Sequence, residues 1–446
     1  MTKQSLSLVL SLMLALANTT SVAGAIVGLQ TSQILSNTAA EAYVPKGSQV
    51  ITDPAVLEYL SRGQQLLKTG FLPGADKAFA EAAKLDAKAY SPRLGQADVA
   101  LRQGKLVDAE RHLRAAQAMA PDSAELAAAA GRLAAGLTRW SEAQKQFERA
   151  ISLDPRFVTP MTDLGELHMS AGRPGEAAKA FRLAIAAAPE HPGAQFGLAR
   201  ALAAQNDAAG ATVALETAAR LAPESALPLM ALGELQLQVG QADKAALTMD
   251  RALKVEPGNL QVRLARANVM AARGDVAGAL SEYTQAFKAQ QGSPGAGAEI
   301  QFRLGQLLES VKRPTEAQAA YTKAAELEPR FHLAHNNIAW LAVQRQQNLE
   351  GALKHVRRAL ELAPGNPAYE DTLGAVLAAR GDVAGALQAY QRALKAAPGA
   401  PGVLYRMGLA YQSAGQKEEA RKAFKAALAS PMAFVEREDA AKRLAP

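Results

Sequence analysis

The chain of 446 residues carries 49 basic and 42 acidic residues, a formal net charge of +7, and no cysteine. The lack of cysteine excludes disulfides, thiol chemistry and a lipid-modified cysteine. Charges of both signs are mixed at helix spacing, as in the stretch Lys417-Glu-Glu-Ala-Arg421, which indicates a solvated surface. Because no basic stripe with stacking aromatic side chains is present, we expect no nucleic-acid partner.

Residues 1–25 have the features of a secretory signal peptide. Lys3 supplies a basic start, the stretch from Leu6 to Ala17 is mainly apolar, and Ala23-Gly24-Ala25 forms a small-x-small cleavage site. We predict cleavage after Ala25 and export to the periplasm or cell envelope, with full secretion left open. The rival interpretation is an uncleaved membrane anchor, but polar residues after Ala17 leave the apolar run short for a bilayer. If the segment is cleaved as predicted, the mature chain contains no integral membrane span.

Residues 26–55 are rich in Ser, Thr, Gln, Asn and Ala and show no helical period. We predict a linker or disordered lead-in for this stretch.

From residue 56 onward, one pattern recurs with a period of 34 residues. In its fourth copy, Ala177, Phe181 and Ala184 lie at spacings of four and three, which is one stripe of a helix. Pro189 ends that helix because proline lacks the amide donor. Gly165 and the alanines let a preceding helix approach closely, and Phe181 fills the remaining space. The tenth copy repeats these positions as Gly374, Ala386, Tyr390 and Ala393.

This pattern resembles the tetratricopeptide repeat, a helix–turn–helix unit of 34 residues. The resemblance implies an all-α fold, a right-handed α-solenoid of about eleven helix-turn-helix repeats with a C-terminal capping helix. We place repeats 1–7 in residues 56–290, a Gly/Pro-containing break in 291–297, repeats 8–11 in 298–432 and the capping helix in 433–446.

No catalytic, cofactor-binding or metal-binding motif emerges from the sequence. There is no Gly-rich phosphate loop, no nucleophile elbow and no His-Glu-x-x-His motif. His332 and His335 are three residues apart, but no carboxylate or cysteine at ligand spacing supports a metal site there. We therefore expect a protein that is not an enzyme and holds no cofactor and no metal.

The resemblance also implies that the first helix of each repeat lines a concave groove in which protein partners lie as extended peptides. On that face, charges of opposite sign alternate between consecutive repeats, at Asp98, Arg132, Glu166, Arg200 and Glu234. We expect pairs across neighbouring repeats that set the stacking register, the alternative being a chance alternation on a charged face. Exposed pairs of this kind contribute only about 0–1 kcal/mol each.

The later repeats place aromatic, amide and guanidinium side chains on the same face, which suits recognition of a peptide. The candidate partner-binding residues are Phe302, Arg303, Gln306, Asn336, Asn337, Trp340, Tyr405 and Arg406. The alternative is that Trp340 only fills space within its repeat.

These features predict a non-catalytic scaffold that binds other proteins in the cell envelope, with self-association left open. One alternative is an accessory subunit of a polysaccharide or protein secretion machine. An alternative of another class is a ligand-binding receptor or enzyme whose site the sequence does not reveal.

Overall fold

The computed structural model describes residues 45, 48–290 and 293–444, which form 23 helices and no strand. The predicted signal peptide and most of the predicted linker lie outside these residues. The helices divide into two compact units, here called unit 1 and unit 2, between Val262 and Arg263. This division falls inside α15 (Leu260–Arg273), ahead of the segment 291–297, whose residues from Pro294 onward begin α17.

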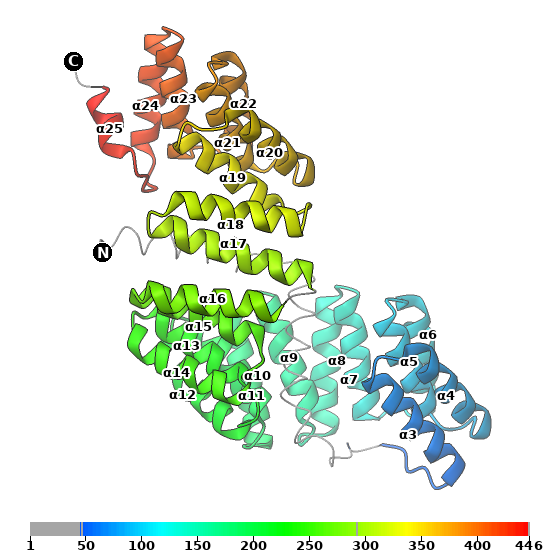
Figure 1. Ribbon diagram of the computed structural model, residues 1–446. Coiled ribbons are helices and arrows are strands. Elements are labelled where there is room, and N and C mark those ends of the chain that lie inside the picture. The colour runs from blue at the N-terminus through cyan, green and yellow to red at the C-terminus, as the bar shows by residue number, and fades with distance from the viewer. Residues whose placement is uncertain (1–44, 46–47, 291–292, 445–446) are drawn as a thin grey trace. The chain divides into compact units, whose positions relative to one another are not determined.

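The expected eleven repeats are present as successive antiparallel helix pairs (Figure 1). Their first helices are α3 (Pro54–Lys68), α5 (Ser91–Arg102), α7 (Ala124–Gly136), α9 (Val158–Ser170), α11 (Pro192–Ala204), α13 (Leu227–Gln238), α15, α17 (Pro294–Ser310), α19 (His332–Gln344), α21 (Pro367–Ala379) and α23 (Pro401–Ser413). Their second helices are α4 (Leu72–Leu85), α6 (Leu106–Met119), α8 (Trp140–Leu153), α10 (Pro174–Ala187), α12 (Ala208–Leu221), α14 (Ala242–Val255), α16 (Val276–Ala289), α18 (Pro314–Leu327), α20 (Leu349–Leu362), α22 (Val383–Ala396) and α24 (Lys417–Ala429).

The repeat core consists of one large ring held between small residues, as the sequence predicts. Phe181 on α10 is fully buried, and so are Ala177 and Ala184. A Cβ atom added at Gly165 on α9 would come within 2.6 Å of the Phe181 ring, and one at Gly197 on α11 would come closer still. Phe181 therefore holds its own repeat and the next one together, which explains why glycine occupies both facing positions.

The turn between the two helices of a repeat requires a left-handed residue. Gly172 has φ of 67° at this position, as the predicted helix end demands. Thr138, Asn206 and Lys312 take the same conformation where their repeats lack the glycine. The turn is therefore imposed by the packing of the two helices, even where the residue is unfavourable for it.

The C-terminal capping helix is shorter than the sequence predicts. It spans α25 (Arg437–Lys442), whereas the helical pattern extends from Phe434 to Leu444. Phe434 and Leu444 still pack against the last repeat, around Tyr405 and Phe424. The cap therefore covers the final apolar face with a short helix and its two flanking residues.

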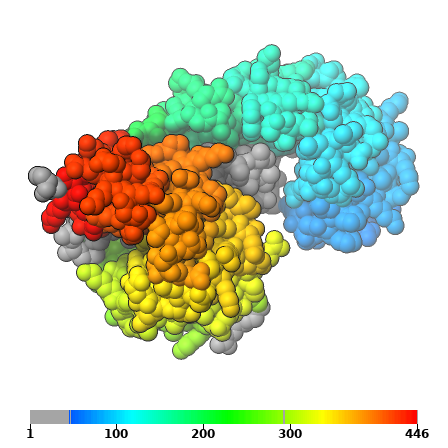
Figure 2. All heavy atoms as spheres, turned by 90° about the horizontal axis from the view of Figure 1, so that it is seen from above, coloured from blue at the N-terminus to red at the C-terminus, as the bar shows by residue number. Residues whose placement is uncertain are grey.

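Several first helices of consecutive repeats pack against one another within each unit, from α3 through α5, α7 and α9 to α11 in unit 1, and from α19 through α21 to α23 in unit 2. In the space-filling view, the repeats of unit 1, blue to green, follow one another along a bent band (Figure 2). The first helices of these repeats thus form a shared face in each unit, on which side chains from several repeats meet.

Candidate functional site

The first-helix face of unit 2 carries a cluster formed by Trp340 of α19, Asp371 of α21 and Arg406 of α23. The guanidinium carbon of Arg406 lies 5.4 Å from the centre of the Trp340 ring, a cation–π contact. Arg406 also donates two hydrogen bonds to Asp371, from Nε to Oδ1 at 2.9 Å and from Nη2 to Oδ2 at 2.5 Å. Three consecutive first helices therefore each contribute one side chain to the cluster, and Asp371 holds the arginine that lies over the ring.

The charge of Arg406 is balanced within this cluster. Burial disfavours the charged guanidinium, but the hydrogen bonds and charge of Asp371 outweigh burial and raise the pKa of Arg406. Glu436, next to the cap helix, adds a contact at 3.5 Å. The half-buried Trp340 is thus the uncharged member of the cluster.

Two of the predicted groove residues belong to the core instead. Phe302 is 7% exposed and packs between the rings of Tyr321 and Phe331, at centroid distances of 5.5 and 5.0 Å. Tyr405 is 8% exposed, and its hydroxyl donates to Asp439 at 2.6 Å. The expectation that both residues face a partner is therefore wrong, because their side chains point into the packing between repeats.

The remaining candidates lie half-buried on α17 and α19. Arg303 donates to Glu299 on its own helix at 2.7 Å, and Gln306 lies one turn further along. The Asn336 amide is 3.4 Å from the side-chain oxygen of Asn337, while its own buried oxygen has no hydrogen-bond partner among the described residues. The structure brings Trp340 and Arg406 together and leaves Arg303 with a partner on its own helix.

A histidine pair that sequence spacing did not reveal joins α19 to α20. Nε2 of His335 lies 3.1 Å from the carbonyl oxygen of Pro329, which can only accept, so this nitrogen carries the hydrogen. Nδ1 of His335 lies 2.9 Å from Nδ1 of His355, within hydrogen-bonding distance. Burial and the neighbouring His335 lower the pKa of His355. His332, the predicted neighbour of His335, contacts the Tyr369 hydroxyl at 2.6 Å instead.

In the part of the chain that the structure describes, no cluster of three or more His, Cys, Asp or Glu side chains could hold a metal ion. Likewise, no helix among the described residues is long and apolar enough to cross a bilayer.

The first-helix face of unit 1 carries a polar ladder across repeats. Glu166 of α9, 3% exposed, accepts from Arg200 of α11 at 2.7 Å, which confirms one predicted pair. Arg132 of α7 instead pairs with Asp163, one helical turn before Glu166, at 3.3 Å. Asp98 contacts Arg102 on its own helix at 3.7 Å, so the expected pairing of Arg132 with its aligned neighbours is wrong.

The difference between these pairs follows from burial. Asp163 and Glu166 are both buried on α9, and burial raises the pKa of each carboxyl group despite its arginine partner. Arg132 pairs with Asp163 and Arg200 pairs with Glu166, so each buried carboxyl group has a positively charged partner. The ladder thus consists of cross-repeat ion pairs, although not all of the predicted ones.

The Glu166–Arg200 pair should show strong coupling in a charge swap. We expect Arg200→Glu to lower the free energy of unfolding of unit 1 by about 2 kcal/mol or more. The variant places a second carboxylate next to the buried carboxylate of Glu166 and removes its positive partner. Exchanging the two, Glu166→Arg with Arg200→Glu, should recover part of this loss in denaturant unfolding.

The matched control exchanges Arg132 with Glu166, which the structure does not pair. That double variant should recover nothing. Equal recovery in both exchanges would mean that the charges act through the general field of the face and not as pairs.

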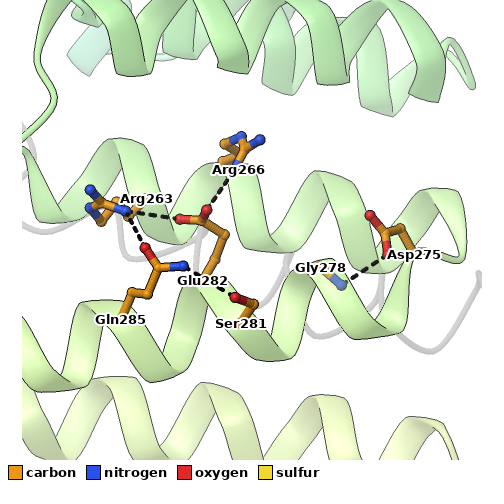
Figure 3. A network of polar contacts seen from close by, with 7 residues as sticks. All are labelled: Arg263, Arg266, Asp275, Gly278, Ser281, Glu282 and Gln285. Atoms are coloured by element: carbon orange, nitrogen blue, oxygen red, sulfur yellow. Dashed lines mark hydrogen bonds and ion pairs between the residues drawn. The ribbon is translucent and has the colours of Figure 1, made fainter.

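A similar polar network links α15 to α16 in the seventh repeat. Glu282 of α16 is 6% exposed and accepts from Arg263 at 3.3 Å and from Arg266, both on α15 (Figure 3). Gln285 also accepts from Arg263, and Asp275 caps the start of α16 through the backbone N–H of Gly278 (Figure 3). These contacts join α15 to α16. Both carboxylate oxygens of Glu282 are engaged by arginines, so the network has a structural role.

Stacked helix pairs that present a continuous polar and aromatic face are the architecture of helical-repeat scaffolds for protein partners. Family models described as tetratricopeptide repeat match residues 60–124, 128–190, 162–226, 230–296, 298–367 and 377–431. The chain therefore belongs to the tetratricopeptide repeat family. The repeats indicate a protein-interaction scaffold, a fold that is typically non-catalytic.

Comparison with individual proteins gives more distant matches. The chain is 27% identical over 236 residues to "Cellulose synthase 1 operon protein C" of Komagataeibacter xylinus, covering 48% of this chain and 17% of that protein. The crystal structure of yeast Tom70 aligns with a TM-score of 0.47 and 13% identity over 87% of this chain and 94% of that chain. Pseudomonas aeruginosa pilF aligns with a TM-score of 0.40 and 19% identity over 47% of this chain and 95% of that chain.

Proposed function

We propose that this protein is a non-catalytic scaffold of the cell envelope that binds an extended segment of a protein partner on the first-helix face of unit 2. The single observation that carries the proposal is the cluster of Trp340, Asp371 and Arg406. An aromatic ring that already lies against a paired arginine loses less conformational freedom when a partner binds than a free side chain does, so more of its contact energy contributes to affinity.

The polar surroundings of Trp340 support a peptide as the partner. Asn336 and Asn337 lie one turn before the ring on the same helix, and Gln306 lies on the preceding first helix. Amide side chains can donate to and accept from a peptide backbone, while the ring packs against an apolar side chain. Because Arg406 is already paired with Asp371, we expect the site to favour an uncharged anchor.

The proposed location rests on the N-terminal sequence. Its basic start, apolar run and small-residue site are those of an exported protein, and the lack of cysteine suits an oxidising compartment. Export would place the repeats where envelope proteins could use them.

Site-specific photocrosslinking in cells tests both parts of this proposal. A bulky aromatic photoprobe replaces Trp340, and the control probe replaces Lys417, which is exposed at the start of a second helix, α24. We expect a discrete adduct from position 340 alone, recovered in the envelope fraction. Equal adducts from both positions, or none from 340, would contradict binding at this face, and recovery in the cytoplasm would contradict export.

A second candidate is an accessory subunit of a polysaccharide or protein secretion machine. The partial match to a protein named for a cellulose synthase operon favours it, although that match spans 17% of the relative. An export-machine subunit in the adduct from position 340 would support this candidate over a general scaffold.

A further inference from the structure

Part of the short segment that precedes α3, residues 49–52, lies against the first two repeats with alternating side chains. Gln49 and Ile51 are partly buried, whereas Val50 between them is 84% exposed and Thr52 is exposed. Alternate burial is the pattern of an extended chain docked along one side. The sequence predicts a linker or disordered lead-in over residues 26–55, and residues 48–53 of that stretch form neither helix nor strand but contact the repeats.

The docking site for Gln49 is built around Tyr90, which lies at the start of α5. The backbone N–H of Gln49 donates to the Tyr90 hydroxyl oxygen at 2.9 Å, and the backbone N–H of Tyr90 donates to the side-chain oxygen of Gln49 at 2.8 Å. These reciprocal bonds engage both the backbone and the side chain of one residue. An extended chain with glutamine at this position fits them without further change.

Glu125 on α7 orients the tyrosine for this task. The Tyr90 hydroxyl donates its hydrogen to Glu125 at 3.1 Å, so its oxygen is left to accept from an incoming backbone N–H. Tyr90 is 3% exposed, and burial raises its pKa, so the phenol keeps its proton. The hydrogen-bonding direction is therefore set by the protein and not by the segment that docks.

An apolar surface next to Tyr90 accepts the residue two positions after the glutamine. Ile51 packs against a cluster of buried side chains from α3, α4 and α5. The members of this cluster are Val56, Leu60, Leu67, Ala75, Phe79, Ala82 and Val99. The surface takes an aliphatic side chain on the same side of the chain as the glutamine, while the intervening residue points to solvent.

We propose that this Tyr90 site is a peptide-binding site for extended segments in which glutamine is followed two residues later by an aliphatic residue. The partner it fits is an extended segment of another protein with this pattern. The chain's own Gln49 and Ile51 occupy the site and compete with that partner. This site lies in unit 1 and is independent of the proposed binding face in unit 2.

A competition experiment on the full chain tests the proposal. The probe is a fluorescent peptide with the sequence of residues 44–54, and the protein is the double variant Gln49→Ala/Ile51→Ser, which weakens the resident segment. We expect this variant to bind the probe about tenfold or more tightly than the unaltered protein does, measured by fluorescence anisotropy. A probe carrying the same two substitutions should not bind.

Adding Tyr90→Phe to the double variant should weaken probe binding by about tenfold, because the backbone acceptor is lost. Circular dichroism of each variant checks that the helices remain folded. No probe binding by a folded double variant, or binding that ignores both Tyr90→Phe and the substitutions in the probe, would overturn the proposal.

Discussion

Replacing Ala184 by aspartate is expected to disrupt the fourth repeat. Ala184 is fully buried on α10, where it packs with Met161 of α9 and Ala194 of α11. A carboxylate there is overpacked and has no ionic partner, so Ala184→Asp should lower the free energy of unfolding by about 3 kcal/mol or more. Denaturant unfolding followed by circular dichroism measures the change.

The matched control is Ala186→Asp, two residues further along the same helix at an exposed position. It introduces the same charge and the same change in helix propensity, and it should alter the free energy of unfolding by about 0.5 kcal/mol or less. Similar losses at the two positions would mean that the assigned helix phase is wrong.

Replacing Asp371 by alanine is expected to have the second largest effect, on both stability and partner binding. The side chains of Asp371 and Arg406 are 14% and 20% exposed, so the variant leaves a largely buried guanidinium without its bidentate partner. Breaking such a pair from one side costs about 3 kcal/mol. Trp340 would also lose the arginine that holds its ring, and adducts from a probe at neighbouring Asn337 should decrease.

A double-mutant cycle separates the pair from its surroundings. Removing both partners, Asp371→Ala with Arg406→Leu, leaves no largely buried guanidinium without its carboxylate and should be less destabilising than Asp371→Ala alone. Additive losses would mean that the two side chains act independently and that the bidentate contact contributes nothing to the position of Trp340.

The buried carboxyl groups of unit 1 predict a pH dependence. Burial raises the pKa of Glu125 above its value in the unfolded chain, so its protonated form favours folding. That contribution is complete below the unfolded pKa, about 4.3, and is lost as the pH rises through the raised folded value. Glu125→Gln keeps an acceptor for Tyr90 without the charge, so it should stabilise unit 1 at pH 7 and have little effect near pH 4. A variant that is equally destabilised at both pH values would contradict this assignment.

The groove residues show where sequence patterns stop being informative. Phe302 and Trp340 both lie on first helices and are both aromatic, yet Phe302 is core and Trp340 is half-buried on the face. Their positions differ by four residues relative to the small residue of each repeat, Gly305 and Ala339. Four residues are slightly more than one helical turn, so the two side chains lie on nearly the same side of their helices. A small rotation around the helix and the rings that pack nearby then decide which of the two is covered.

The polar contacts were less predictable than the core. Opposite charges at 34-residue spacing identified the Glu166–Arg200 pair, but Arg132 reaches Asp163 because a long side chain can choose between carboxylates one turn apart. The pairing of His335 with His355 joins residues 20 apart on two helices, and no local period marks it. Tyr90 and Gln49 are 41 residues apart, and again no local period in the sequence marks their contact.

The sequence by itself determined the repeat, its helix pairs and its packing, because glycine, alanine, one ring and proline recur at spacings that only a stacked helix pair accommodates. The tertiary structure alone decided which polar side chains meet, how the left-handed turn forms at Thr138 without glycine, and that Gln49 docks on Tyr90. The physical reason is that apolar packing follows a period along the chain, whereas hydrogen bonds and ion pairs depend on distances between side chains of different helices, which exist only once the repeats have stacked.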